Sequence, residues 1–122
     1  MEARIPTAAA IDQATVEAVR LFAERITAKS DVLDMMLFGS RARGDHARDS
    51  DADVAVLLRG DHQRLLPTKL AMADEAFDVL LETGIRIQPL PIWEYEWADP
   101  DHYINPRLPK NIAREGLRAT TD

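Results

Sequence analysis

The sequence predicts an α/β domain in which helices back a small sheet. Two long amphipathic helical patterns, short apolar runs typical of buried strands, and their alternation along the chain favour this class. The chain has 122 residues, enough for one domain that buries about two-thirds of its unfolded surface. We therefore expect a single domain over 1–122, with its core over about 10–91 and a C-terminal extension over 92–122.

The first predicted element is an amphipathic helix over about 11–27. Its apolar residues recur at steps of three and four, as one face of a helix requires. Asp12 lies at its start, where a carboxylate caps a helix or interacts well with its dipole. We assign this helix no chemical role.

A buried strand and a tight turn follow. The apolar run from Val32 to Phe38 predicts the strand, and Gly39 ends it because a residue without Cβ lets the backbone turn sharply. A short helix is expected next, over 40–43, with Ser40 as its cap and Gly44 as its stop. Its first amides and the Ser40 hydroxyl would then form an anion site. A Gly-Ser pair alone is more often a plain turn, so the next residues decide between the two interpretations.

Two aspartates open the next apolar run, over 51–58. Because successive side chains of a strand point to opposite faces, Asp51 and Asp53 share one face with Ala55 and Leu57. Aspartate is a poor strand former, and like charges so placed repel. A divalent cation between them reverses that repulsion, and Mg²⁺ takes carboxylate oxygens together with water and phosphate. The alternative is a polar loop end whose aspartates cap nearby backbone groups.

The second long helix is predicted over about 63–83, with Pro67 in its first turn, where the missing amide does little harm. Asp78 and Glu82 lie off its apolar stripe, and we expect them in solvent. Gly84 ends the helix. The apolar residues at three- and four-residue steps are expected to form its core face: Leu66, Leu70, Ala73, Phe77 and Leu80.

A third strand is predicted over 85–90, at a sheet edge or ended early, because Pro89 has no amide hydrogen. Farther on, Trp93, Tyr95 and Trp97 alternate with glutamates, which indicates a short strand or an irregular cover over the core. Core or edge packing of these aromatics is favoured over base stacking or partner contact. A last short helix is expected over 110–115.

Composition excludes several functions. The net charge of −6 argues against general nucleic-acid binding, which depends on Lys and Arg neutralising phosphates. There is no cysteine, so thiol chemistry is excluded and a reducing cytoplasmic setting is expected. The sequence has neither a signal-peptide pattern nor an apolar run of about 18 residues, so no membrane-spanning segment is expected. His46, His62 and His102 lack metal-ligand spacing, and we expect all three at the surface.

Gly39-Ser40, ten intervening residues and then Asp51-Ala52-Asp53 on an apolar strand resemble the signature of the minimal nucleotidyltransferases, small relatives of the DNA polymerase β superfamily. The resemblance covers roughly residues 10–90. It implies a nucleotidyltransferase fold, a small mixed sheet backed by helices. It also implies Mg²⁺-dependent transfer of AMP from ATP to a hydroxyl with release of pyrophosphate.

The same resemblance assigns roles by motif position. Gly39 and Ser40 would hold the β and γ phosphates of ATP, and Asp51 and Asp53 would hold Mg²⁺. Two loop arginines, Arg41 and Arg43, suit phosphate oxygens, although solvated pairing with neighbouring carboxylates is an equal alternative.

The sequence departs from this family at one position. Most active relatives bring a third carboxylate from the strand after the long helix, where this chain carries Arg86 and Gln88. Gln88 offers only a neutral carbonyl, and Arg86 repels a cation. The missing acid comes from elsewhere, with Glu94 and Asp78 nearest in sequence, or one metal suffices, or transfer is slow or absent.

The resemblance further implies a partner. About thirty residues after Pro91 are too few for the acceptor-binding domain of larger relatives, so the acceptor docks from outside. Stand-alone members resemble antitoxins that adenylylate a tyrosine of a helical HEPN toxin. Two functions stay open, an adenylyltransferase antitoxin and a weakly active or inactive binding module that neutralises its partner by contact. A small-molecule nucleotidyltransferase is disfavoured. The aromatic segment 93–97 is a candidate interface for a homo- or hetero-oligomer.

Overall fold

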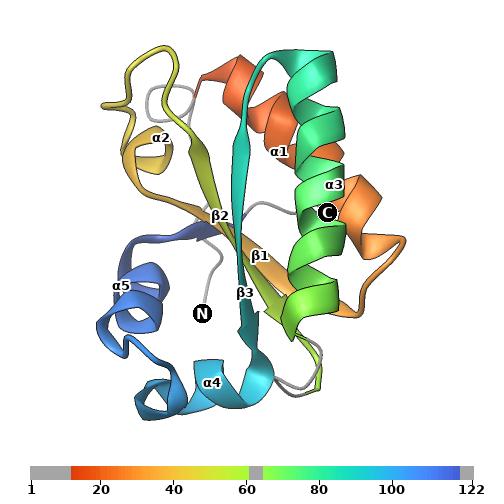
Figure 1. Ribbon diagram of the computed structural model, residues 1–122. Coiled ribbons are helices and arrows are strands. Elements are labelled where there is room, and N and C mark those ends of the chain that lie inside the picture. The colour runs from red at the N-terminus through yellow and green to blue at the C-terminus, as the bar shows by residue number, and fades with distance from the viewer. Residues whose placement is uncertain (1–11, 61–64, 119–122) are drawn as a thin grey trace.

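The computed structural model describes residues 12–60 and 65–118, which form a four-stranded sheet flanked by helices (Figure 1). The strand order is β3-β2-β1-β4. The elements are α1 Gln13–Thr27, β1 Val32–Phe38, α2 Ser40–Arg43, β2 Ala52–Leu58, α3 Leu65–Thr83, β3 Ile87–Trp93, α4 Glu94–Ala98, the 3₁₀ turn η2 Pro100–His102, α5 Arg107–Glu115 and β4 Leu117–Arg118.

The sheet is mixed, as expected. β1 runs antiparallel to β2, with Phe38 opposite Asp53, and β4 runs antiparallel to β1. β3 runs parallel to β2, with Ala52 opposite Ile87. The prediction that the strand containing Pro89 lies at an edge is confirmed. The parallel pair requires a long crossover, and α3 supplies it.

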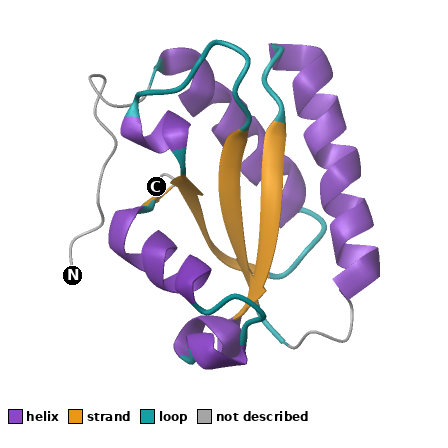
Figure 2. Cartoon of the chain, turned by 60° about the vertical axis from the view of Figure 1, so that its left-hand side comes forward, coloured by secondary structure: helices purple, strands orange, loops and turns teal. Residues whose placement is uncertain are grey.

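Helices cover both faces of this sheet (Figure 2). A large buried cluster joins α1 and α3 to the β2 side chains Val54 and Val56. A smaller cluster on the other face contains Ala55, Leu57 and Ile112, the last from α5. The predicted alternation along β2 is therefore confirmed, and it places Asp53 on the face that carries the smaller cluster.

The predicted core face of α3 is wrong. Leu66, Leu70 and Phe77 are 65, 59 and 57% exposed. The residues that α3 buries are Met72, Glu75, Ala76 and Val79. Both sets recur at three- and four-residue steps, so the helix carries two adjacent apolar stripes, and the sequence period alone does not distinguish them.

A carboxylate helps to hold α3 against α1. Glu75 is 3% exposed and pairs with Arg25 (Nε–Oε1 2.9 Å) and Lys29, both from α1. These two cations hold the pKa of Glu75 below its usual value against the effect of burial. Arg25 also reaches Asp78 at 2.9 Å and Glu82 at 3.5 Å, so these two carboxylates, expected to be solvated, form ion pairs between the helices.

Residues 93–118 add helices, a strand and core side chains to the sheet. The aromatic segment is predicted as a strand or an irregular cover. Its first residue, Trp93, ends β3 and is 3% exposed, and Tyr95 and Trp97 lie in α4. α5 begins at Arg107, and after it Leu117 of β4 pairs with Leu37. The extension expected over 92–122 therefore contributes side chains to the core, among them Ile112 and Leu117. Within 12–60 and 65–118, no helix combines the length and apolarity needed to cross a membrane.

Candidate phosphate and metal site

The site begins where β1 ends beside the start of β2. Gly39 follows Phe38, the register partner of Asp53, and has φ 78° and ψ −159°. A Cβ at this position would stand 2.4 Å from Oδ2 of Asp53. Glycine is favoured at this position for two reasons. Residues with a side chain rarely adopt this φ, and the Asp53 carboxylate occupies the space that a Cβ would take. The turn is held directly against Asp53.

The short helix α2 starts differently from the prediction. Its N-cap is Gly39, and no side chain caps it, so the capping role expected of Ser40 is wrong. The amides of Ala42 and Arg43 both donate to the Gly39 carbonyl at 3.1 Å. Within the described part of the chain, the amides of Ser40 and Arg41 find no acceptor. Free amides in such a turn are suited to anion binding.

The paired aspartates lie next to this turn. Asp53 is half-buried, and burial raises its pKa, with a further contribution from the negative charge of Asp51; Arg43 acts in the opposite direction. Asp51 precedes β2 and lies 3.7 Å from Nε of Arg86. Two repelling carboxylates, one of them partly desolvated, form a donor set that favours a bound cation.

The position of the third acid is occupied by an amide. Gln88 on β3 is the register partner of Asp53. Over residues 12–60 and 65–118, no cluster of three or more His, Cys, Asp or Glu side chains is arranged to hold a metal. Mg²⁺ commonly binds proteins through one or two carboxylates with waters and substrate phosphates, so Asp51 and Asp53 fit that ion without a third acid.

Neither candidate replacement for the third acid lies in this site. Glu94 follows the opposite end of β3, where it accepts a hydrogen bond from the amide of Gly60 at 3.1 Å. Asp78 pairs with Arg25 of α1. Of the three alternatives, the one in which Glu94 or Asp78 completes the site is therefore not supported, because both side chains make contacts elsewhere in the fold.

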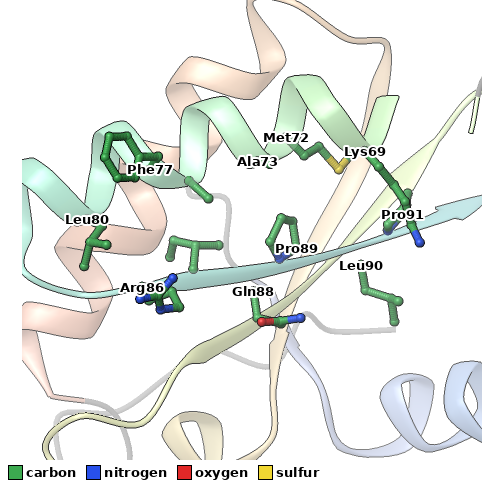
Figure 3. Close-up of a pocket in the computed structure, with 12 residues that line it drawn as sticks. Lys69, Met72, Ala73, Phe77, Leu80, Arg86, Gln88, Pro89, Leu90 and Pro91 are labelled. Atoms are coloured by element: carbon green, nitrogen blue, oxygen red, sulfur yellow. The ribbon is translucent and has the colours of Figure 1, made fainter. Parts of the chain in front are cut away.

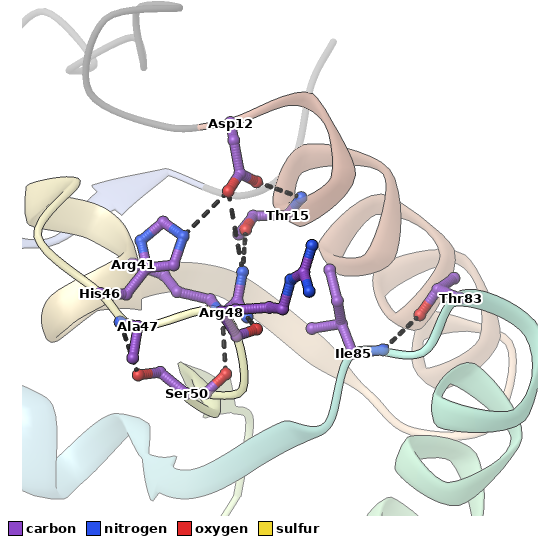
Figure 4. Close-up of polar contacts among 9 residues, drawn as sticks. All are labelled: Asp12, Thr15, Arg41, His46, Ala47, Arg48, Ser50, Thr83 and Ile85. Atoms are coloured by element: carbon purple, nitrogen blue, oxygen red, sulfur yellow. Dashed lines mark hydrogen bonds and ion pairs between the residues drawn. The ribbon is translucent and has the colours of Figure 1, made fainter.

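Arg41 has a structural position that its sequence context does not reveal. It is 3% exposed, and its guanidinium donates to Ser50 O at 2.8 Å, to Thr15 Oγ1 at 2.7 Å and to Arg48 O at 2.9 Å (Figure 4). These bonds join the loop over 44–51 to α1. All three side-chain nitrogens are used, so we leave the Arg41 guanidinium, but not the Arg41 backbone amide, out of the phosphate-binding set.

Arg43 is arranged differently. Its side chain is exposed, and its Nε lies 3.2 Å from the carboxylate of Asp45. Its positive charge opposes the rise in the pKa of Asp53, and it ends α2, the short helix that follows the Gly39 turn. An exposed surface ion pair contributes little and exchanges readily, so Arg43 is available to contact a phosphate.

His46 is less exposed than expected. Its Nε2 lies 2.9 Å from Oδ2 of Asp12, and its Nδ1 is buried without a hydrogen-bond partner among the described residues. Asp12 is the N-cap of α1, as predicted, and accepts the Thr15 amide at 2.7 Å. Hydrogen bonds from Thr15, and then the interaction with His46, lower the pKa of Asp12 to about 2. These contacts strengthen the attachment of the loop to α1.

Comparison with known proteins identifies a family. Residues 19–115 match the family model described as a nucleotidyltransferase domain, a stretch that includes the Gly39 turn and both aspartates. A candidate nucleotidyltransferase from Sulfolobus solfataricus, known from a crystal structure, is 18% identical with a TM-score of 0.39. That similarity covers 87% of this chain and 86% of the other. No curated protein is significantly similar.

Proposed function

The chain belongs to the nucleotidyltransferase domain family, and from this premise we propose that it transfers AMP from ATP to a hydroxyl of a partner protein in a Mg²⁺-dependent reaction. The observation that carries the proposal is the contact between the Gly39 turn and Asp53. It brings free amides, suited to phosphate, next to two carboxylates, suited to a cation.

The residues of the chain have separate tasks in this reaction. The amides of Ser40 and Arg41 and the Ser40 hydroxyl bind the β and γ phosphates, and Arg43 adds a charged contact. Asp51 and Asp53 hold Mg²⁺, which when bound offsets the charge that develops on the leaving pyrophosphate. The acceptor oxygen then bonds to the α phosphorus as the bond to the bridging oxygen breaks. The hydroxyl proton leaves to water.

For the acceptor we propose a tyrosine of a HEPN-type toxin, which would make this chain an antitoxin. The support is the resemblance of the Gly39-Ser40 and Asp51/Asp53 motifs to stand-alone minimal nucleotidyltransferases. The geometry adds that the aspartate pair lies at one end of the sheet, near the edge strand β3. A separate protein can reach such a position without entering the fold.

A second candidate function is a binding module that neutralises its partner by contact. Gln88 beside Asp53 and Arg86 at 3.7 Å from Asp51 favour it, because both weaken the site's hold on a cation. In this case Asp51 and Asp53 are present, but the chain transfers no nucleotide.

Labelled ATP separates the two functions. The purified chain is incubated with Mg²⁺, ATP labelled at the α phosphate and a lysate of its source, and protein-bound label is measured. Transfer predicts a labelled band that is lost with Asp51→Asn and with Asp53→Asn. The control Asp49→Asn, an exposed loop acid, keeps the label. No label in spite of Mg²⁺-dependent ATP binding would support the binding module.

A further inference from the structure

A second apolar stripe on α3 lies in solvent. We call it the outer stripe, and its members follow one another at steps of four, three, four and three: Leu66, Leu70, Ala73, Phe77 and Leu80. Leu66, Leu70 and Phe77 are each more than half exposed. This spacing is that of the contact positions of a coiled coil, and it is typical of a helix that packs on another helix. Large exposed apolar patches mark interaction sites.

Three members of the outer stripe, Ala73, Phe77 and Leu80, line a groove of about 440 Å³ between α3 and β3 (Figure 3). Met72, Ala76 and Ile87 are buried side chains that line it. Pro89 and Pro91 of β3 line it on the side opposite α3. The stripe and the groove form one apolar surface along the edge of the sheet.

The free edge of β3 is unsuited to pairing with another strand. The amide of Ala52 donates to the Arg86 carbonyl, while the residue opposite Ala52 is Ile87. In a parallel ladder the backbone N–H and C=O groups of the even-numbered residues of β3 therefore bond to β2. Those of the odd-numbered residues point away from the sheet, toward the free edge. Pro89 and Pro91 occupy two of these outward positions and have no amide hydrogen. An added strand would find no donor at either, so the occupant binds through its side chains.

The charged side chains around the groove indicate the chemistry of the partner segment that binds there. Lys69 and Arg86 line the groove, and Lys69 makes no ion pair with any residue of the described segments. A helix that carries carboxylates beside its apolar positions complements this rim. A second copy of α3 does not. Antiparallel packing about Ala73 would bring the two Asp74 carboxylates together and would set Lys69 opposite apolar residues.

We propose that the outer stripe and its groove bind one amphipathic helix of a partner protein, with apolar residues at three- and four-residue steps and carboxylates that face Lys69 and Arg86. The groove lies on the sheet face that carries the large cluster, because Met72, Ala76 and Ile87 belong to that cluster, whereas Asp53 lies on the opposite face, so the bound helix and the candidate site are separated by the sheet. That this partner is also the nucleotide acceptor rests on the proposed function. The docking surface itself does not.

Photo-crosslinking in cells of the source tests the surface. Benzoylphenylalanine replaces Leu70 or Phe77, and the control carries it at Ile104, which is 95% exposed outside the groove. Mass spectrometry identifies the crosslinked peptide. We expect both stripe positions, but not the control, to capture a helical segment with the stated spacing and flanking acids. A crosslink to residues 65–83 of a second copy, a captured segment without this pattern, or yields equal to the control would overturn the proposal.

A charge reversal tests the rim. Lys69→Glu is expected to reduce the crosslink yield at least threefold, whereas Lys110→Glu, which removes an exposed lysine paired with Asp101, leaves it unchanged. Melting temperatures within about 3 °C of the wild type would show that both variants are folded. An unchanged yield in Lys69→Glu contradicts the acidic helix.

Asp53→Asn should abolish transfer and keep the crosslink, so failure of the catalytic proposal is distinguishable from failure of the docking proposal.

Discussion

Gly39 and Asp53 determine the site at the scale of single residues. The glycine has a positive φ, and its missing Cβ leaves the space that Oδ2 of Asp53 occupies. Asp53 is half-buried beside this turn, and burial raises the pKa of Asp53. A turn that binds phosphate and a carboxylate that binds a cation are therefore positioned by one backbone feature.

Gly39→Ala should lower the free energy of unfolding by about 2–4 kcal/mol, because backbone strain adds to the clash with Asp53. Gly84→Ala is the matched control. Gly84 also has a positive φ, of 80°, but a Cβ there meets nothing within 4 Å, so a loss of about 1 kcal/mol is expected. Urea unfolding measures both variants. Equal losses would show that the contact with Asp53 does not constrain residue 39.

Asp53→Asn should stabilise the metal-free protein at pH 7 by about 0.2–1 kcal/mol, because it removes the repulsion from Asp51. The pKa of Asp53 is higher in the folded protein than its usual 3.8, so the folded state binds the proton more tightly. The free energy of unfolding that the wild type loses through the ionised Asp53 carboxylate therefore grows as the pH rises from 3.8 through the raised pKa. Above that pKa the loss stays constant.

The gain in unfolding free energy from Asp53→Asn should accordingly vanish once the pH falls below the usual pKa of an aspartate. Unfolding in urea and EDTA from pH 3 to pH 7 measures it. Asp49→Asn, an exposed loop variant, is expected to show a change near zero at every pH. A loss of stability in Asp53→Asn at pH 7 would contradict the account of the site as a repelling pair.

At the scale of elements, Arg41 links α2, the loop over 44–51 and α1. Its three nitrogens donate to Ser50, Thr15 and Arg48, and Asp12 and His46 pair beside it (Figure 4). The loop leads directly into the aspartates at the start of β2. Its anchorage is therefore a condition for the position of Asp51.

Arg41→Lys should lower the free energy of unfolding by about 2–4 kcal/mol, because one ammonium cannot satisfy three acceptors in these directions. Arg43→Lys, at an exposed position, should stay within about 0.5 kcal/mol. Urea unfolding and ATP affinity are measured together. A stable Arg41→Lys with weakened ATP binding would instead identify Arg41 as a phosphate ligand.

At the scale of the whole molecule, the sequence predicts the order of the main elements well. β1, β2 and the turn at Gly39 follow from short apolar runs and glycine, which act locally. The exposed stripe of α3 could not be recognised, because two stripes share one period and only the packed sheet selects between them. The anchoring role of Arg41 was also out of reach, since its partner Thr15 lies 26 residues away. Long-range contacts of this kind leave no local signal.

The central claim is that the Gly39 turn and the two aspartates form one site for Mg²⁺ and nucleotide. Calorimetric titration of the purified chain with ATP, in Mg²⁺ and in EDTA, tests it most directly. We predict that binding requires Mg²⁺, weakens at least tenfold in Asp51→Asn and Asp53→Asn, and is unchanged in Asp49→Asn. Equal affinity in EDTA, or wild-type affinity in both strand variants, would contradict the claim.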